Sequence, residues 1–128
     1  MTLNLVPPHT RVTTTGDGER FDISASVSRT FLCTLEISDQ IEQESIDMWI
    51  LVSSDGETWP AKPFLMLPQR FYKGRTSLLL DLTLHPEIRF IRAHWELNRW
   101  GRVAPTPMFV ISFTAEEVPA SQPLVARR

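Results

Sequence analysis

Apolar and polar residues alternate with a period of two along most of this chain. Six segments each carry four apolar residues at every second position: 21–27, 31–37, 46–52, 78–84, 91–97 and 109–115. Neighbouring side chains of a strand point to opposite faces of a sheet, so this spacing is typical of strands that bury one face. In segment 46–52 the intervening positions hold Trp49 and Leu51, which predicts a central strand covered on both sides. No segment shows the spacing of a clear amphipathic helix.

Residues 88–102, which read IRFIRAHWELNRWGR, combine such a strand with a polar turn. The apolar face of the strand carries a large anchor for the core, Trp95. Its other face carries three side chains able to bind a ligand: Arg92, His94 and Glu96. The turn that follows adds Arg99, Trp100 and Arg102. We therefore interpret this stretch as a scaffold strand that ends in a candidate contact loop.

Four segments lack the alternation. Residues 1–19 contain Pro7, Pro8 and a glycine-rich turn, so we expect an irregular N-terminal arm with one edge strand at 11–15. Residues 38–45 are acidic and are expected to form a loop or one helical turn. Residues 60–74 hold three prolines, which exclude a helix, and their apolar side chains are expected to lie across the core: Phe64, Met66 and Phe71. Residues 119–128 have no periodicity and are expected to be a C-terminal tail.

The fold class that follows is an all-β, antiparallel β-sandwich formed by residues 20–118 as a single domain. Proline-rich crossings and uneven spacing favour a jelly-roll-like or Greek-key layout, and a closed barrel is the structural alternative. The length of 128 residues suits one domain with a sizeable core.

A single cysteine, Cys33, excludes an internal disulfide, so the chain does not require an oxidising compartment. Because Cys33 alternates with apolar residues, we expect it to be a buried small hydrophobe. The first residues show no secretion signal, and no apolar run is long enough to span a bilayer. The expected location is the cytoplasm by default, with incorporation into a particle or appendage as the alternative.

Charge is distributed unevenly along the chain. Residues 1–69 carry a net charge of −6 and residues 70–128 carry +4, within a total of −2. If the two halves formed different surfaces, copies of the chain could meet with opposite charges facing each other. If strands of both halves interleave, this polarity averages out.

No motif for catalysis or cofactor binding is present: the chain lacks a glycine-rich phosphate loop, a Gly-x-Ser-x-Gly elbow and zinc-type Cys/His spacing. His9 and His85 are expected to be bystanders. His94 and Glu96 share a strand face and could form an acid–base or ligand pair, or a solvated stripe with Arg92. The chain is therefore predicted not to be an enzyme and to need no cofactor.

Two other kinds of site have weak signals. Four carboxylates could gather around calcium, which binds several oxygens, although the alternative is a plain acidic surface: Asp39, Glu42, Glu44 and Asp47. Arginines and aromatic residues alternate after residue 88, but the slightly acidic chain argues against nucleic-acid binding.

Two motifs carry a resemblance to a known family. Residues 54–59, SDGETW, resemble the S-x-D-G-x-x-W hairpin of discoidin-like (galactose-binding-like) domains, shortened by one residue before the aspartate. Residues 88–92, IRFIR, resemble the aromatic-isoleucine-arginine strand that follows in those domains. The resemblance covers about residues 46–97. It implies a jelly-roll β-sandwich that binds glycans, lipids or proteins through loops at one end.

Two hypotheses for the function follow. The first is a non-catalytic subunit of a larger assembly, such as a homo-oligomer of phage or appendage type, in which the charge split suits a head-to-tail contact. The second is a carbohydrate- or small-ligand-binding module with contact residues around the turn: Trp100, Arg99, Arg102, His94 and Trp59. In that module an exposed tryptophan would offer a stacking platform and arginines would donate directed hydrogen bonds.

Overall fold

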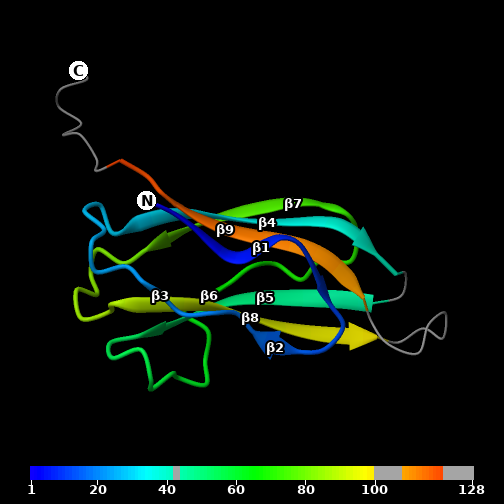
Figure 1. Cartoon of the computed structure of the whole chain (residues 1–128), viewed down its shortest axis with the longest axis horizontal. Coiled ribbons are helices and arrows are strands. Elements are labelled where there is room, and N and C mark those ends of the chain that lie inside the picture. The colour runs from blue at the N-terminus through cyan, green and yellow to red at the C-terminus, as the bar shows by residue number, and fades with distance from the viewer. Residues whose placement is uncertain (42–43, 100–107, 120–128) are drawn as a thin grey trace.

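The computed structural model describes residues 1–41, 44–99 and 108–119. In these ranges every regular element is a strand, and the strands form two antiparallel sheets that pack face to face (Figure 1). The chain is therefore an all-β sandwich, as the alternation predicts. No helix in the described ranges is long and apolar enough to cross a membrane.

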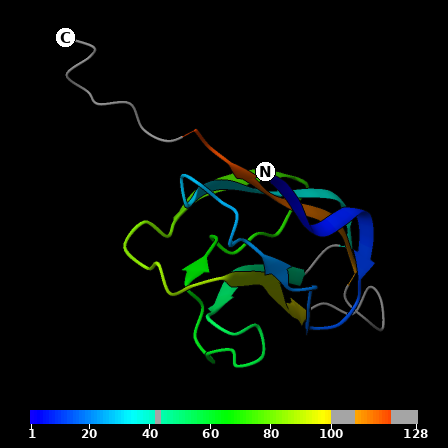
Figure 2. The ribbon, with the colours of Figure 1, turned by 60° about the vertical axis from the view of Figure 1, so that its left-hand side comes forward.

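Sheet A has the strand order β1-β9-β4-β7, and sheet B has the order β2-β8-β5-β6, with β3 also paired to β8. Figure 1 shows sheet A as the upper layer and sheet B as the lower layer, and Figure 2 shows the same two layers after rotation. The strands of the described ranges are β1 (Thr2–Val12), β2 (Gly16–Asp17), β3 (Phe21–Asp22), β4 (Thr30–Gln40), β5 (Glu44–Ser53), β6 (Leu65–Met66), β7 (Gly74–Asp81), β8 (Phe90–Arg99) and β9 (Phe109–Glu117).

The core lies between the two sheets and consists of the inward-facing residues of the alternating pattern. Its largest fully buried side chains include Phe31, Phe109 and Phe113 from sheet A, which face Ile46 and Met48 from sheet B. The expected strands at 31–37, 46–52, 91–97 and 109–115 are confirmed in β4, β5, β8 and β9. Trp95 is only partly buried and packs against this core from its edge.

Cys33 is buried between the sheets, as predicted from its position in the alternation. Burial raises the pKa of its thiol to about 12, because the thiolate would be formed away from water. The expectation for β5 as a central strand is also confirmed, since it pairs with β6 on one side and with β8 on the other. Leu51 is buried on its outer face and Trp49 is partly buried there.

The N-terminal segment differs from the expected irregular arm. It forms the 11-residue strand β1, which pairs with β9 along its length and buries Leu5 and Val6. The pairing register of β1 with β9 shifts between Asn4 and Thr10, the part of the strand that contains the two prolines. His9, in the same part, has a positive φ of 60°. An edge strand tolerates proline and bulges where the missing N–H faces solvent, so the prolines masked a strand that was predicted only at 11–15.

The expected strand at 21–27 is wrong beyond its first residues. β3 ends at Asp22, and the Ser26 N–H donates to the carbonyl of Ile23 in a turn. Oε2 of Glu117, at the end of β9, accepts hydrogen bonds from the backbone N–H groups of Val27 and Ser28. These bonds and those from the Ser26 and Ser28 side chains hold the pKa of Glu117 down to about 2. A long-range carboxylate therefore fixes a turn where the local pattern predicted a strand.

Three further segments differ from expectation. Residues 38–41 and 44–45 are largely strand, as ends of β4 and β5, and not a loop or helical turn. In segment 60–74 the expected core side chains are exposed: Phe64, Met66 and Phe71. Leu67 is buried there instead. In the pairing of β6 with β5, Leu65 lies opposite the buried Ile50, so odd-numbered residues of this segment face the core and even-numbered residues face outward. β7 ends at Asp81, so Leu84 lies beyond it and is 86% exposed.

In the described ranges the charge asymmetry of the sequence does not follow the division of the strands into two sheets. Sheet A contains β1 and β4 from the acidic half and β7 and β9 from the basic half. Sheet B likewise places β8 between strands of the acidic half. Each sheet therefore mixes strands of the acidic half with strands of the basic half.

Candidate functional site

The outer face of sheet B is hollowed by a cleft of about 310 Å³. Its floor consists of side chains that face away from the core on two neighbouring strands. Trp49 of β5 lies opposite His94 of β8, and Leu51 lies opposite Arg92. The rings of Trp49 and His94 are tilted against each other with centroids 4.9 Å apart. The antiparallel register therefore brings together side chains that are more than 40 residues apart in the sequence.

One wall of the cleft is the loop of residues 54–64, which lies on the outer side of sheet B, at the bottom of Figures 1 and 2. The loop begins with a tight turn at Asp55 and Gly56. Oδ1 of Asp55 accepts hydrogen bonds from the backbone N–H groups of Thr58 and Glu57, both at 2.8 Å. These bonds, together with one from Ser53, hold the pKa of Asp55 well below its usual range. The turn is thus fixed by a charged acceptor and carries Trp59 to the cleft.

Gly56 is essential to this turn for two reasons. Its φ is +81°, a backbone conformation that residues other than glycine rarely adopt. A Cβ atom built there would lie 2.8 Å from Nη1 of Arg20 and 3.1 Å from Cδ1 of Phe90. Nη1 of Arg20 also donates a hydrogen bond of 2.7 Å to the Gly56 carbonyl, so the turn is tied to the segment before β3.

Trp59 closes the cleft against Arg92. The guanidinium carbon of Arg92 lies 4.5 Å from the centroid of the Trp59 ring, in a cation–π contact. Arg92 Nε is 3.8 Å from Oδ1 of Asp17, which enters from β2 at the other side of β8. Trp59 also lines a neighbouring hollow of about 480 Å³ with Phe64 and His85. It therefore stands between two recesses on the same side of the molecule.

His94 lies between two carboxylates at the centre of the cleft. Its Nδ1 is 2.8 Å from Oδ1 of Asp17, and its Nε2 is 3.2 Å from Oε2 of Glu96. Both ring nitrogens thus have a partner. These contacts fix the positions of the His94 ring and of the two carboxylates. Because both ring nitrogens are engaged, neither is open to act as a metal ligand or general base.

Two N–H donors of the cleft lack an acceptor among the described residues. Nε1 of Trp49 and Nε of Arg92 are both shielded from solvent and make no hydrogen bond. Leaving a buried donor unpaired costs about 1–3 kcal/mol. Because both atoms are shielded from solvent, a ligand oxygen would reach them only if a neighbouring side chain moved.

The far end of the outer face is acidic. Asp47 lies opposite Glu96 in the β5–β8 pairing. Partial burial raises the pKa of Asp47, and the negative charge of Glu96 raises it further, against the lowering effect of a hydrogen bond from Gln69. The carboxylates of Glu96 and Asp17 therefore both line the cleft, and Asp47 lies beside Glu96 on the neighbouring strand.

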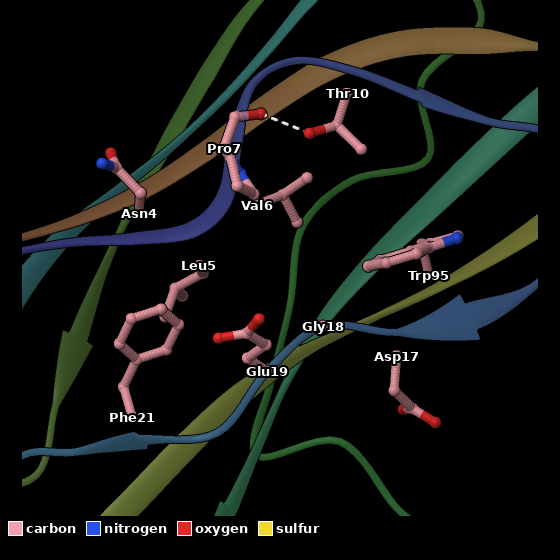
Figure 3. Close-up of a pocket in the computed structure, with 10 residues that line it drawn as sticks. All are labelled: Asn4, Leu5, Val6, Pro7, Thr10, Asp17, Gly18, Glu19, Phe21 and Trp95. Atoms are coloured by element: carbon pink, nitrogen blue, oxygen red, sulfur yellow. Dashed lines mark hydrogen bonds between the residues drawn. The ribbon is translucent and has the colours of Figure 1, made fainter.

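A third hollow, of about 330 Å³, opens at the edge of the sandwich between the two sheets. Figure 3 shows that β1 contributes Leu5 and Val6 from one side, and that Glu19, before β3, and Phe21, in β3, contribute from the other. Trp95 lies at one end, where its Nε1 donates a hydrogen bond of 2.9 Å to the Thr14 carbonyl. This recess is mainly apolar, so it offers fewer groups that could orient a polar ligand than the outer cleft.

The structure brings together only part of the predicted contact set. Trp59 and His94 both line the outer cleft. Arg99 is the last residue of β8, and Trp100 and Arg102 lie outside the described residues. The cleft contains two important residues that were not predicted as contacts, Trp49 and Asp17. The outward alternation of Trp49 was a signal for it, but the register that places it beside His94 was not readable from the sequence.

The calcium candidates are not gathered into a site in the described ranges. Glu44 is 1% exposed, and its two carboxylate oxygens accept the backbone N–H groups of Ile41 and Met108, both at 2.7 Å. Oδ1 of Asp39 accepts the N–H of Gln40, and Glu42 lies outside the described residues. No group of three His, Cys, Asp or Glu side chains in the described ranges could hold a metal ion. Glu44 instead ties the start of β5 to the start of β9.

Comparison with known proteins does not assign the chain to a family. No protein-family model matches it, and no curated protein matches it.

Proposed function

We propose that the chain is a non-catalytic binding module that takes an uncharged carbohydrate in the outer cleft of sheet B. The observation that carries the proposal is the composition of this one recess: two tryptophans, the guanidinium group of Arg92, and the carboxylates of Asp17 and Glu96. Sugar rings combine apolar C–H faces with hydroxyl groups that both donate and accept. Aromatic rings pack against the C–H faces, and N–H donors and carboxylates form hydrogen bonds with the hydroxyl groups.

The charges of the cleft favour a neutral ligand. Arg92 is close to Asp17, and His94 lies between Asp17 and Glu96. A strongly acidic sugar would meet these carboxylates, and a cationic ligand would meet Arg92. The cavity of about 310 Å³ is at the lower end of the usual range of about 300–1,000 Å³ for ligand pockets. We therefore expect one or two sugar units to be bound.

The strand order is compatible with the jelly-roll layout that the resemblance to discoidin-like domains implies. Successive strands pass from one sheet to the other except from β2 to β3 and from β5 to β6, which stay in sheet B. The turn at residues 54–59, which carries the resemblance, positions Trp59 at the cleft. Jelly-roll sandwiches occur in lectins and in capsids, so this fold is compatible with a glycan-binding role and also with an assembly role.

The proposal is tested by titrating the ¹⁵N-labelled chain with neutral methyl hexosides and by screening it on a glycan array. We expect shifts of the backbone amides of Trp49, Trp59 and His94. Trp59→Ala should weaken binding about 10-fold, because a stacking aromatic contact is lost. Tyr72→Ala is the matched control, since Tyr72 is a 72% exposed aromatic residue that does not line the cleft. Shifts confined to other surfaces, or equal loss in both variants, would contradict the proposal.

A further inference from the structure

The outer edge of sheet A is unusual in being long and regular. β7 pairs only with β4 in the described part of the chain, and the eight residues of β7 keep an unbroken register with it. No proline or bulge interrupts this strand. The opposite edge, β1, contains Pro7 and Pro8 and two register shifts. Proteins usually protect exposed edges with such features, because unpaired backbone groups are a template for another strand.

The direction of the free backbone groups can be assigned. The N–H of Leu82 donates to the carbonyl of Arg29, which continues the register of β7 on β4. Hydrogen-bonded and non-hydrogen-bonded positions alternate along an antiparallel strand. Leu80 and Leu78 therefore use their backbone groups toward β4, whereas Leu79 and Ser77 direct theirs to the open edge.

The side chains of this edge are self-complementary. Arg75, Ser77, Leu79 and Asp81 are all exposed on the outer face of β7. If a second β7 pairs antiparallel with the first about Leu78, Arg75 of each copy lies opposite Asp81 of the other. In the same register Ser77 lies opposite Leu79, so every outward-directed backbone group meets one from the other copy. Arg75 also contacts Glu36 of its own chain at 3.3 Å, which places it between two carboxylates.

We infer that β7 is a homodimer interface, through which two copies join their A sheets into one continuous antiparallel sheet around a twofold axis at Leu78. Such an interface is isologous, so the same residues are used by both copies. Leu79 is 57% exposed and lies opposite Leu32, which is 38% exposed, so an apolar patch borders the edge that pairing would cover. The inference is independent of the carbohydrate cleft, which lies on the other sheet.

Sedimentation velocity of the full chain over a range of concentrations tests this inference. The native chain should be a dimer that dissociates on dilution. Ser77→Pro should be a monomer with a native circular dichroism spectrum, because the lost N–H faces the open edge and is not used by β4. Ser77→Ala is the matched control and should remain dimeric, since both variants lose the 2.9 Å hydroxyl contact with Thr34.

A charge reversal tests the register separately. Arg75→Glu should raise the dimer dissociation constant about 10-fold, because two symmetry-related ion pairs become repulsive. Adding Asp81→Lys to that variant should restore dimerisation. A native chain that is monomeric at all concentrations, a dimer that survives Ser77→Pro, or a failure of the double variant to recover would each overturn the inference.

Discussion

The outer face of sheet B and the open edge of sheet A belong to the same sandwich but have opposite characters. The face of sheet B is hollowed, partly covered by a loop, and carries large aromatic and charged side chains that contact one another. The edge strand β7 of sheet A is regular, and it carries small, apolar and charged side chains. A recess lined by aromatic and charged side chains suits a small polar molecule, whereas a regular row of backbone groups suits another strand.

This difference arises from how each region is fixed by the chain. The cleft depends on a turn held by Asp55 and Gly56 and on a register that aligns Trp49 with His94. The β7 edge depends only on its own sequence and on pairing with β4. Substitutions in the common core should therefore affect both regions, and local substitutions should affect one of them.

The largest effect is expected for Phe113→Ala. Phe113 is fully buried between the sheets, and truncation of such a side chain costs about 3–5 kcal/mol. Both the cleft and the edge should be lost together with the fold. Trp95→Ala should cost less, because Trp95 is only partly buried at the edge of the core. Urea denaturation of both variants measures the order; a larger loss for Trp95→Ala would contradict this account of the core.

A smaller and local effect is expected for Gly56→Ala. The positive φ alone should cost about 1–2 kcal/mol, and the added Cβ would also displace Arg20 or Phe90. We expect weaker sugar binding, since the turn positions Trp59, but unchanged dimerisation. Glu57→Ala in the same turn is the control, because Glu57 contributes its backbone N–H and its side chain is exposed. Sedimentation and the hexoside titration separate the two outcomes, and loss of the dimer in Gly56→Ala would show that the cleft and the β7 edge are not independent.

The smallest effect at neutral pH concerns Glu117, which joins β9 of sheet A to the turn after β3. Its pKa is lowered from 4.5 to about 2 by the hydrogen bonds from Ser26, Val27 and Ser28. Because the pKa in the folded chain is below the ordinary value, the ionised group stabilises the fold above about pH 4.5. This contribution should be lost as the pH falls from 4.5 toward about 2.

Glu117→Gln should remove that part of the pH dependence, whereas Glu116→Gln, at the exposed neighbouring position, should keep it. Thermal denaturation between pH 6 and pH 2 measures both. The melting temperatures of native chain and Glu117→Gln should converge at low pH, and parallel curves would show that the carboxylate does not have this role.

The sequence predicted the sandwich because β4, β5, β8 and β9 combine long alternation with turns between them. It did not predict β1, where Pro7 and Pro8 hide the pattern and pairing with β9 supplies the stability. The alternation also predicted a strand that continues beyond the end of β3. Hydrogen bonds to Glu117, far along the chain, hold residues 26–28 in a turn instead. Long-range partners decided both cases.

For the cleft, the sequence indicated Trp59 and His94 individually but not their arrangement. Trp49 was recognised as outward-facing, yet only the β5–β8 register places it against His94. Asp17 reaches the cleft because the short strand β2 pairs with β8 at His94. Register and edge pairing depend on the whole fold, so local alternation cannot specify them.

The central claim is that sheet B binds a neutral sugar independently of the strand edge through which two copies join. The most direct measurement is an amide-resolved NMR titration of the Ser77→Pro chain with the neutral hexoside that binds the native chain. We predict the native affinity and shifts at Trp49, Trp59 and His94 in a monomer. Loss of binding in this monomer, or shifts that gather along β7, would contradict the separation of the two surfaces.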